Sequence, residues 1–167
     1  MYELNICHLY PEILNLYGDR GNIMALKKRC EWRGINVNVV NVSLGDPFIP
    51  ENYDMVFFGG GQDYEQEIIQ DDLKKNKAAE IKSAVENDMV FLCICGGYQL
   101  MGQFYRTSDG KEIEALGALD LWTLGGRERM IGDIVYQCDF LVSDDCDGKV
   151  VGFENHSGKT YLGKDVK

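Results

Sequence analysis

The sequence predicts an α/β protein built on a central, mostly parallel β-sheet. In the first part of the chain, short apolar segments alternate with segments whose apolar residues recur at helical spacing. This alternation is typical of a parallel sheet with helices on both faces. After Tyr105 the pattern changes to strands and turns, which predicts an antiparallel continuation rather than a separate domain. We therefore expect residues 1–167 to form a single domain.

The individual elements follow from the same patterns. In the first part, strands are predicted at residues 2–9, 35–42, 54–58 and 89–94. Helices are predicted at residues 22–33, at 63–86 with a break near residue 71, 72 or 76, and from residue 98 onward. Residues 43–52 are predicted to be a loop. In the second part, strands are predicted at 118–124, 129–141 and 149–153, and turns at 109–110 and 143–148.

Composition and charge exclude several classes of function. The 167 residues carry a formal net charge of −10. This charge argues against nucleic acid or an anionic membrane surface as a partner, because both attract basic patches. No apolar segment is long enough to span a bilayer, so direct membrane insertion is not expected. The charge is compatible with an enzyme acting on a small molecule, or with docking onto a basic face of another protein.

The six cysteines do not form a metal-binding pattern. No C-x-x-C pair is present and the only histidines are His8 and His156, so a zinc site of ordinary spacing is not expected. Several cysteines fall within apolar patterns, where a reduced thiol packs as a small apolar group. Without a signal peptide, we expect reduced thiols and a cytoplasmic location. His8, within the first strand, is expected to be structural.

The stretch around Cys95 carries the candidate chemistry. An apolar strand ends at Cys95, two glycines follow, and Tyr98 begins a helical pattern. This order of strand, sharp turn and helix is typical of a nucleophile elbow. Unpaired amides at the helix N-terminus favour the thiolate, so the pKa of Cys95 is expected to be low. The alternative is a buried, inert thiol, which is our interpretation of Cys93 inside the strand.

Acyl transfer through a Cys thioester also needs donors for an oxyanion. The amide of Gly96, directly after the nucleophile, is one candidate. Gly59-Gly60-Gly61 ends the preceding strand, and parallel strands place their carboxyl ends at one edge of a sheet. We therefore expect Gly60 and Gly61 to supply the second donor. Alternatively, the three glycines form a tight turn or a phosphate-binding loop, although no P-loop Lys-Ser/Thr follows them.

These motifs resemble those of the class I, triad-type glutamine amidotransferases. Cys95-Gly96-Gly97-Tyr98-Gln99 is similar to the nucleophile motif of the branch that contains the amidase domain of cobyric acid synthases. Further matches resemble the glutaminase subunits of lipid II isoglutaminyl synthases. They are Leu14-Asn15-Leu16-Tyr17, Gly21-Asn22-Ile23, Gly59-Gly60-Gly61 with Asp63 and Glu65-Gln66, Arg129 with Gly132-Asp133-Ile134-Val135, and Val151-Gly152-Phe153-Glu154-Asn155-His156 with Gly158 and Thr160-Tyr161. The resemblance covers the whole chain and implies a flavodoxin-like fold.

The resemblance implies a glutaminase that hydrolyses L-glutamine and supplies ammonia to a Mur-ligase-like partner (MurT type). The partner would form a heterodimer with this subunit and amidate the D-glutamate of lipid II in peptidoglycan synthesis. It would hold ATP, Mg²⁺ and, as a further candidate, Zn²⁺, while this subunit holds no cofactor or metal. Cys95 would be the nucleophile, and Gln99 and Arg129 would bind the substrate, with Arg129 on its α-carboxylate. Alternatively, Arg129 is a solvated side chain beside Arg127 and Glu128.

The general base of this family is absent from its expected motif. The family carries a His in a Thr-Tyr-Leu-His-Gly type motif, whereas Thr160-Tyr161-Leu162-Gly163 lacks it and the sequence ends at Lys167. We therefore expect a glutaminase shortened at its C-terminus, which by itself releases little ammonia. His156 and Glu154 are expected to support the site or an interface, and His156 is not expected to be the base.

Two other functions remain open. One is a non-catalytic interaction subunit, in which the glutaminase fold serves as a scaffold or a glutamine sensor. The other is the amidase portion of a cobyrinic or cobyric acid synthase, which would be distinguished by a fused N-terminal domain that uses ATP.

Overall fold

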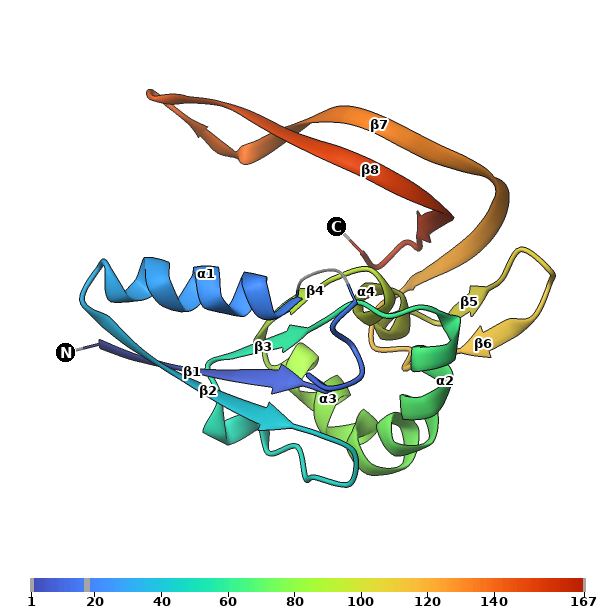
Figure 1. Ribbon diagram of the computed structural model, residues 1–167, viewed down its shortest axis with the longest axis horizontal. Coiled ribbons are helices and arrows are strands. Elements are labelled where there is room, and N and C mark those ends of the chain that lie inside the picture. Colours follow the sequence, from blue (N-terminus) through green and yellow to red (C-terminus); the bar gives the residue numbers. More distant parts are fainter. Residues whose placement is uncertain (1, 17–18, 167) are drawn as a thin grey trace.

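The computed structural model describes residues 2–16 and 19–166, so Tyr17 and Gly18 of the loop motif lie outside the described residues. These residues form two four-stranded sheets (Figure 1). The first, with strand order β2-β1-β3-β4, is parallel throughout and confirms the predicted α/β class. The second, with order β6-β5-β7-β8, is mixed, and β7 and β8 form its long antiparallel pair.

The strands of the first sheet lie close to their predicted positions. They are β1 (Tyr2–Leu9), β2 (Ile35–Val42), β3 (Met55–Phe58) and β4 (Val90–Cys93). The register aligns Leu9, Phe58 and Cys93 across β1, β3 and β4. The carboxyl ends of these strands, and the loops that follow them, therefore lie at one edge of the sheet.

Helices cover both faces of this sheet, as predicted (Figure 1). The helical elements are α1 (Asp19–Glu31), a 3-10 turn η1 (Pro50–Asn52), α2 (Asp63–Asp72), a π-helical turn η2 (Leu73–Lys77), α3 (Ala78–Glu86) and α4 (Gly96–Met101). On one face, Ile23 of α1 packs with Ile6 and Phe57. On the other face, Ile69 of α2 and Ile81 of α3 are buried in a second, larger core.

Two helical segments differ in detail from the prediction. α1 begins at Asp19, before the predicted start at Asn22, because Gly21 is accommodated in the first turn and an acidic residue there interacts favourably with the helix dipole. After α1 the chain turns at Gly34, whose φ of +72° is a conformation that glycine favours. The predicted break within residues 63–86 is the π-helical turn η2, which keeps the whole segment helical.

A buried ion pair fixes the end of α2. Asp72 pairs with Lys77, whose side chain is fully buried, and accepts a hydrogen bond of 2.8 Å from the Tyr10 hydroxyl. Its other carboxylate oxygen accepts hydrogen bonds from Asn76 (2.8 Å) and the Gly45 amide (3.1 Å). Burial alone would raise the pKa of Asp72, but these hydrogen bonds outweigh it and lower the pKa to about 2. The cluster ties the helical segment to the loops after β1 and β2.

The C-terminal half of the chain is dominated by one long hairpin. The strands of this half are β5 (Phe104–Arg106), β6 (Glu112–Glu114), β7 (Leu121–Ser143) and β8 (Cys146–Leu162), of which β7 and β8 form the hairpin. β7 and β8 pair along nearly their whole length, with register irregularities between Gly125 and Met130 and between Gln137 and Val142.

The prediction of several short strands in this half was wrong. Residues 121–124 of the first predicted strand and the whole predicted strand 129–141 belong to the single strand β7, because the irregularity after Gly125 absorbs the intervening residues without ending the pairing. The predicted turn 143–148 shortens to residues 144 and 145. The predicted strand 149–153 is the middle of the much longer β8.

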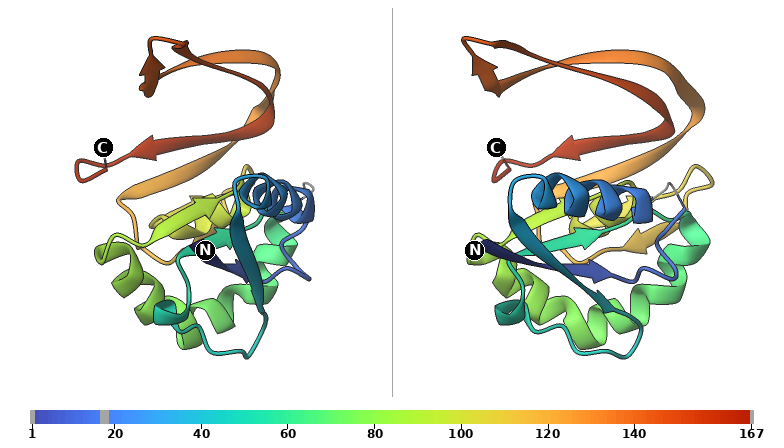
Figure 2. Two further views of the ribbon diagram at one scale, coloured as in Figure 1. Left: turned by 90° about the vertical axis from the view of Figure 1, so that its left-hand side faces the viewer. Right: turned by 60° about the vertical axis from the view of Figure 1, so that its left-hand side comes forward.

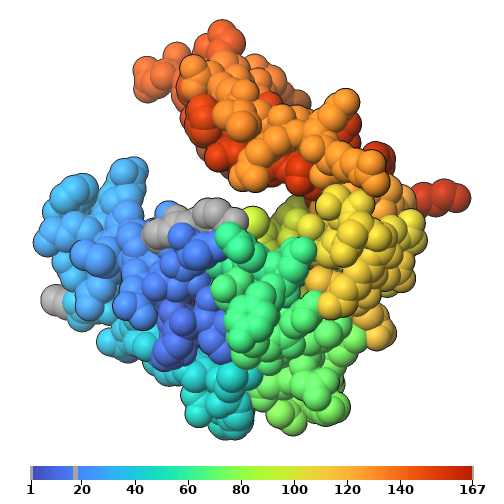
Figure 3. All heavy atoms as spheres, turned by 45° about the vertical axis from the view of Figure 1, so that its right-hand side comes forward, coloured from blue at the N-terminus to red at the C-terminus, as the bar shows by residue number. Residues whose placement is uncertain are grey.

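The hairpin rises from the body and arches over the side of the first sheet on which α1 lies (Figure 2). Figure 3 shows that it joins the body near β5 and β6 and is separated from α1 by open space. One of its faces carries Ile131, Val135, Val151 and Phe153, each more than half exposed. An exposed apolar patch of this kind is typical of an interaction surface.

The loop after β3 and the start of α4 approach each other more closely than side chains allow. The Gly97 amide donates a hydrogen bond of 3.1 Å to the Gly59 carbonyl. A Cβ on Gly97 would lie 2.5 Å from the Phe58 oxygen and 2.6 Å from the Gly59 oxygen. A Cβ on Gly96 would lie 2.7 Å from the Gly61 oxygen. Because these neighbours are backbone atoms that cannot move aside, both positions require glycine.

The buried ion pair gives a first prediction. Asp72→Asn is expected to lower the free energy of unfolding by about 3–5 kcal/mol, because it leaves the Lys77 charge buried without a counter-charge. Asp71→Asn is the control, since Asp71 pairs with Lys75 on the surface and its substitution is expected to change the free energy of unfolding far less. Urea unfolding of both variants measures the difference.

The pH dependence of unfolding checks the same pair. The pKa of Asp72 is lower in the folded chain than its ordinary value of about 4, so its stabilisation is present above that pH and is lost as the pH falls through about 2. The difference in stability between the unmodified chain and Asp72→Asn should therefore shrink as the pH falls over this range. A difference that stays constant down to pH 2 would contradict the assignment.

The close approach of the glycines gives a second prediction. Gly97→Ala is expected to lower the free energy of unfolding by about 1–3 kcal/mol, because the added methyl group overlaps backbone oxygens. Gly21→Ala is the matched control, since no other described segment comes within 4 Å of its Cβ position and it lies within α1, where alanine stabilises by about 0.5–1 kcal/mol. Equal stability of the two variants would contradict the prediction.

Candidate active site

Cys95 lies in the turn between β4 and α4, where the sequence predicts a nucleophile elbow. β4 ends at Cys93, the Ile94 amide donates to the Phe58 carbonyl (2.9 Å), and α4 begins at Gly96. Cys95 is exposed and has φ of +49° and ψ of −110°, a conformation that side-chain-bearing residues rarely adopt. Strained backbone of this kind is frequent at residues that react with or bind a ligand.

The thiols within the sheet differ from Cys95. Burial raises the pKa of Cys93 to about 12. Burial also raises the pKa of Cys7 to about 12, against the opposing effect of the Lys77 charge. Both thiols therefore stay protonated at neutral pH and are poor nucleophiles. Of the two cysteines at the end of β4, Cys95 is the exposed one.

The amides predicted to bind an oxyanion lie beside Cys95. A Cβ on Gly96 would lie 2.7 Å from the oxygen and 3.1 Å from the nitrogen of Gly61, so these residues are in direct contact. The Gly60 carbonyl accepts a hydrogen bond from the Leu16 amide (3.2 Å), which fixes the loop from its other side. Among the described loops and turns, the N–H groups of Gly60, Gly61 and Gly96 donate to no backbone carbonyl. This geometry is compatible with the prediction that these amides donate to an oxyanion.

Gln99 connects the elbow to the hairpin. It lies one helical turn after Cys95, and its backbone amide donates to the Cys95 carbonyl (3.0 Å). Its side-chain oxygen accepts a hydrogen bond from Gln66 of α2 (3.1 Å). Its side-chain nitrogen lies 3.6 Å from the position of a Cβ on Gly158 of β8. Gln66 belongs to a motif that carries the resemblance, Gly59-Gly60-Gly61 with Asp63 and Glu65-Gln66, but the motif gives it no role and does not indicate its contact with Gln99.

Tyr105 and Asp63 form a second polar contact near Cys95 that the sequence does not indicate. The pKa of Tyr105 is raised to about 12, first by burial and then by the Asp63 carboxylate, to which its hydroxyl is hydrogen-bonded. The charge of Cys95 has a smaller effect in the same direction. The pair joins β5 to the first residue of α2, and such a distant pairing in sequence leaves no local motif.

The other predicted residues lie on the hairpin. Arg129 Nε donates to Asn155 Oδ1 (2.6 Å), so the guanidinium is held against the facing strand. His156 is about half exposed; its Nε2 is hydrogen-bonded to Glu154 (3.0 Å) and its Nδ1 to the Gly158 carbonyl (2.9 Å). The predicted residues thus form an elbow group and a hairpin group, which meet where Gln99 approaches Gly158.

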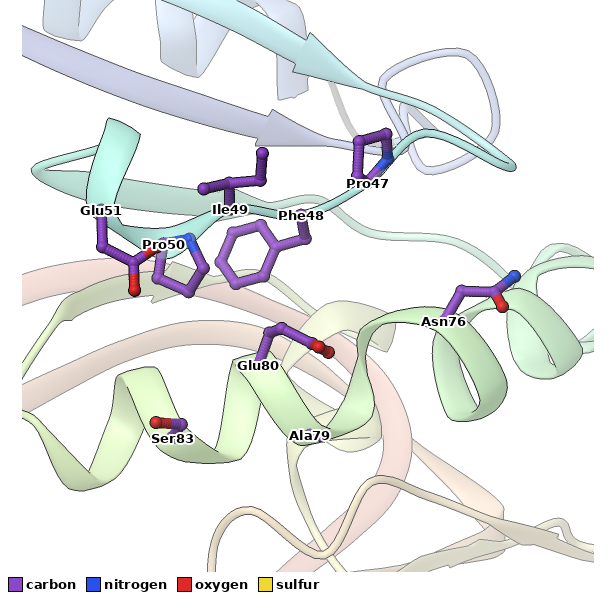
Figure 4. A pocket seen from close by; sticks show the side chains of 9 residues that line it. All are labelled: Pro47, Phe48, Ile49, Pro50, Glu51, Asn76, Ala79, Glu80 and Ser83. Atoms are coloured by element: carbon purple, nitrogen blue, oxygen red, sulfur yellow. The ribbon is translucent and has the colours of Figure 1, made fainter.

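Two surface cavities lie apart from the elbow. A cavity of about 520 Å³ lies between residues 47–51 and the segment η2–α3 (Figure 4), and no predicted site residue lines it. A cavity of about 290 Å³ lies on the hairpin and is lined by Arg127, Glu128 and Ser157, among others. Among the described residues, no group of three or more His, Cys, Asp or Glu side chains is arranged to hold a metal ion.

No helix within residues 2–16 and 19–166 has both the length and the apolar character needed to cross a membrane.

Known proteins similar to this chain are glutamine-dependent enzymes. Residues 5–167 match the CobB/CobQ-like glutamine amidotransferase domain. The chain is 48% identical, over 99% of its length, to the lipid II isoglutaminyl synthase (glutamine-hydrolyzing) subunit GatD of Streptococcus pneumoniae (strain ATCC BAA-255 / R6). It is 45% identical, over 96% of its length, to the same subunit of Staphylococcus aureus (strain N315). It spans 62% and 63% of the lengths of these relatives.

Two further proteins are more distantly similar to this chain. A cobyric acid synthase of Alkaliphilus metalliredigens (strain QYMF) is 29% identical over 82% of this chain and 28% of its own length. The structure of PurLQS from Thermotoga maritima covers 98% of this chain and 71% of that chain, with a TM-score of 0.54 and 18% identity, a likeness that concerns the fold alone. Because the family match extends over residues 5–167, the chain belongs to the CobB/CobQ-like glutamine amidotransferases.

Proposed function

We propose that this chain acts as the glutaminase subunit of a lipid II isoglutaminyl synthase, hydrolysing L-glutamine and passing the ammonia to a Mur-ligase-like partner. The observation that carries the proposal is the identity of 48% and 45% to two GatD subunits, which extends over nearly the whole chain. The elbow at Cys95 supports it, because an exposed thiol beside free backbone amides is the arrangement that thioester chemistry requires.

The proposed reaction proceeds through two steps at Cys95. The thiolate attacks the side-chain carbonyl carbon of glutamine, and the amides of Gly61 and Gly96, with Gly60 in the same loop, donate to the resulting oxyanion. The proton given up by the Cys95 thiol is returned to the substrate nitrogen, so that the carbon–nitrogen bond breaks, ammonia leaves and a glutamyl thioester remains. Water then attacks the thioester, which releases glutamate and restores the thiol.

His156 and Glu154 are assigned a supporting role on the hairpin. One ring nitrogen of His156 is engaged by Glu154 and the other by the Gly158 carbonyl, so both are already occupied. A general base for Cys95 needs a ring nitrogen within hydrogen-bond reach of the thiol. The proposal therefore does not use His156 as the base.

The partner is assigned the activation of the acceptor. The relatives are described as subunits, which supports a second protein in the complex. ATP, Mg²⁺ and lipid II are assigned to that protein, while this subunit handles L-glutamine. Cys7 and Cys93 are buried thiols that form no disulfide, which supports a cytoplasmic location for the reaction.

The similarity to cobyric acid synthases supports a second candidate, an amidase that serves such a synthase. Its lower identity of 29% makes it the weaker one. Purification of the tagged protein from its source cell separates the two: recovery of a Mur-ligase-like protein supports the first candidate, whereas recovery of a cobyric acid synthase component supports the second.

The reactivity of Cys95 gives a third prediction. A chloroketone that resembles glutamine is expected to label Cys95 alone, because Cys93 is buried and its pKa is about 12. Mass spectrometry of the digested protein identifies the labelled residue. Cys95→Ser is expected to abolish labelling and Cys93→Ser to leave it intact. Label that persists in Cys95→Ser would reject the elbow, and no label on the unmodified chain would favour a non-catalytic subunit.

The role of Arg129 gives a fourth prediction. Arg129→Ala is expected to raise the chloroketone concentration that half-saturates labelling by about tenfold to a hundredfold, as expected for loss of a charge-assisted hydrogen bond to a carboxylate. Arg127→Ala is the matched control, because it removes the same charge two residues away and is expected to change the value less than about twofold. Equal effects of the two variants would contradict a specific contact and show that Arg129 acts only as a general surface charge.

A further inference from the structure

Gln66 is a buried polar side chain that the proposed reaction does not use. It lies in the first turns of α2, directly after the glycine loop, and is 1% exposed. A capping box fixes this turn: the Gln62 amide donates to the Glu65 carboxylate (2.9 Å), and the Gln66 amide donates to the Gln62 carbonyl (3.0 Å). The position of the Gln66 side chain is therefore set by the backbone of the helix start.

The side-chain nitrogen of Gln66 reaches three parts of the candidate site. Nε2 donates to Gln99 Oε1 at 3.1 Å and lies 3.5 Å from the Gly61 carbonyl oxygen. It also lies 3.0 Å from the position of a Cβ on Gly96. The side-chain amide of Gln66 thus contacts the glycine loop and two residues of α4, Gly96 and Gln99.

The hydrogen bond from Gln66 fixes the orientation of the Gln99 carboxamide. It therefore determines whether the oxygen or the nitrogen of Gln99 faces β8. In a carboxamide the oxygen only accepts and the nitrogen only donates. Because Oε1 of Gln99 is held by Gln66, its Nε2 is the group near β8, 3.6 Å from the Cβ position of Gly158. The free end of Gln99 is therefore a hydrogen-bond donor, which suits an acceptor oxygen of a ligand.

The other end of the Gln66 side chain argues against a purely structural role. Its Oε1 is buried and has no hydrogen-bond partner among the described residues. A buried polar atom without a partner lowers stability, so folding alone would favour an apolar side chain of similar size. The stability of the fold therefore does not account for a glutamine at this position.

We propose that Gln66 is a positioning residue for glutamine binding. By donating to Gln99 Oε1, it fixes the Gln99 carboxamide with its NH₂ group toward an acceptor oxygen of the bound substrate. The inference rests on the proposed glutaminase function and extends it by naming the residue that orients the substrate-binding amide. Gln66 acts through Gln99 and does not itself contact the substrate.

Gln66→Met tests this role, because methionine fills a similar volume but cannot donate a hydrogen bond. The chloroketone concentration that half-saturates labelling of Cys95 is expected to rise about threefold to tenfold, as expected for one misdirected neutral hydrogen bond. The labelling rate at saturation should change less than about twofold, because the thiol is not altered. The thermal midpoint of unfolding should stay the same or rise. A lower midpoint with unchanged half-saturation would show a structural role and overturn the inference.

Gln70→Met is the matched control. Gln70 lies one turn further along α2, and its Nε2 donates to the Glu114 carbonyl (2.9 Å) rather than to a site residue. This variant is expected to leave half-saturation unchanged. Gln66→Glu is a second variant, which keeps a polar side chain of the same size but replaces the donor by an acceptor. It is expected to turn the Gln99 carboxamide around and raise half-saturation at least as much as Gln66→Met.

Combination with Gln99→Met separates action through Gln99 from a direct effect. If Gln66 acts through Gln99, Gln66→Met adds no further rise in the Gln99→Met background. Additive effects of the two substitutions, or unchanged half-saturation in both Gln66 variants, would overturn the inference. No labelling of Cys95 in the unmodified chain would instead overturn the proposed function, so the two failures are distinguishable.

Discussion

The candidate site depends on the direct contact between two backbone segments at the end of the parallel sheet. The loop after β3 lies against the start of α4 with no side chain between them, because Gly61, Gly96 and Gly97 occupy the contact. Parallel pairing of β3 with β4 brings the two segments to the same edge, and the glycines remove the remaining separation. The position of Cys95 relative to the loop amides is therefore set by the backbone, without adjustable side chains.

The helix α2 is fixed at both of its ends, and this matters for the elbow. At its start, the capping box between Gln62 and Glu65 joins it to the glycine loop. At its end, Asp72 connects it to Lys77 in η2 and to the loops after β1 and β2. A helix held at both ends keeps Gln66 against α4. The Asp72 cluster at the far end of α2 therefore contributes to the geometry beside Cys95.

Much of the fold was predictable because the first half obeys simple periodic rules. β-branched segments such as Ile35–Val42 form strands where expected, and the strand, cysteine and two glycines around Cys95 form the expected turn. The hairpin was not predictable in its full length, because glycines at 125 and 126 signal a strand end and the pairing of β7 with β8 overrides that signal.

The residues around the predicted site were harder to find. Motif and resemblance pointed to Cys95, Gly60, Gly61 and Gln99, which lie in consecutive or neighbouring segments. Gln66 and Tyr105 reach the same edge from α2 and β5, and their contacts depend on tertiary packing that no local pattern encodes. The segment 63–86 is predicted to be a polar helix with a break. The burial of the charged Lys77 side chain at that break carries no periodic signal in the sequence.

The backbone at Cys95 has a consequence for the evolution and design of this fold. Its φ of +49° is a conformation that glycine adopts with less strain than cysteine. A sequence chosen for stability alone would therefore place glycine there and lose the proposed nucleophile. If Cys95 is the nucleophile that we propose, its backbone represents a local trade-off between stability and activity, and stabilisation by design must hold this one position fixed.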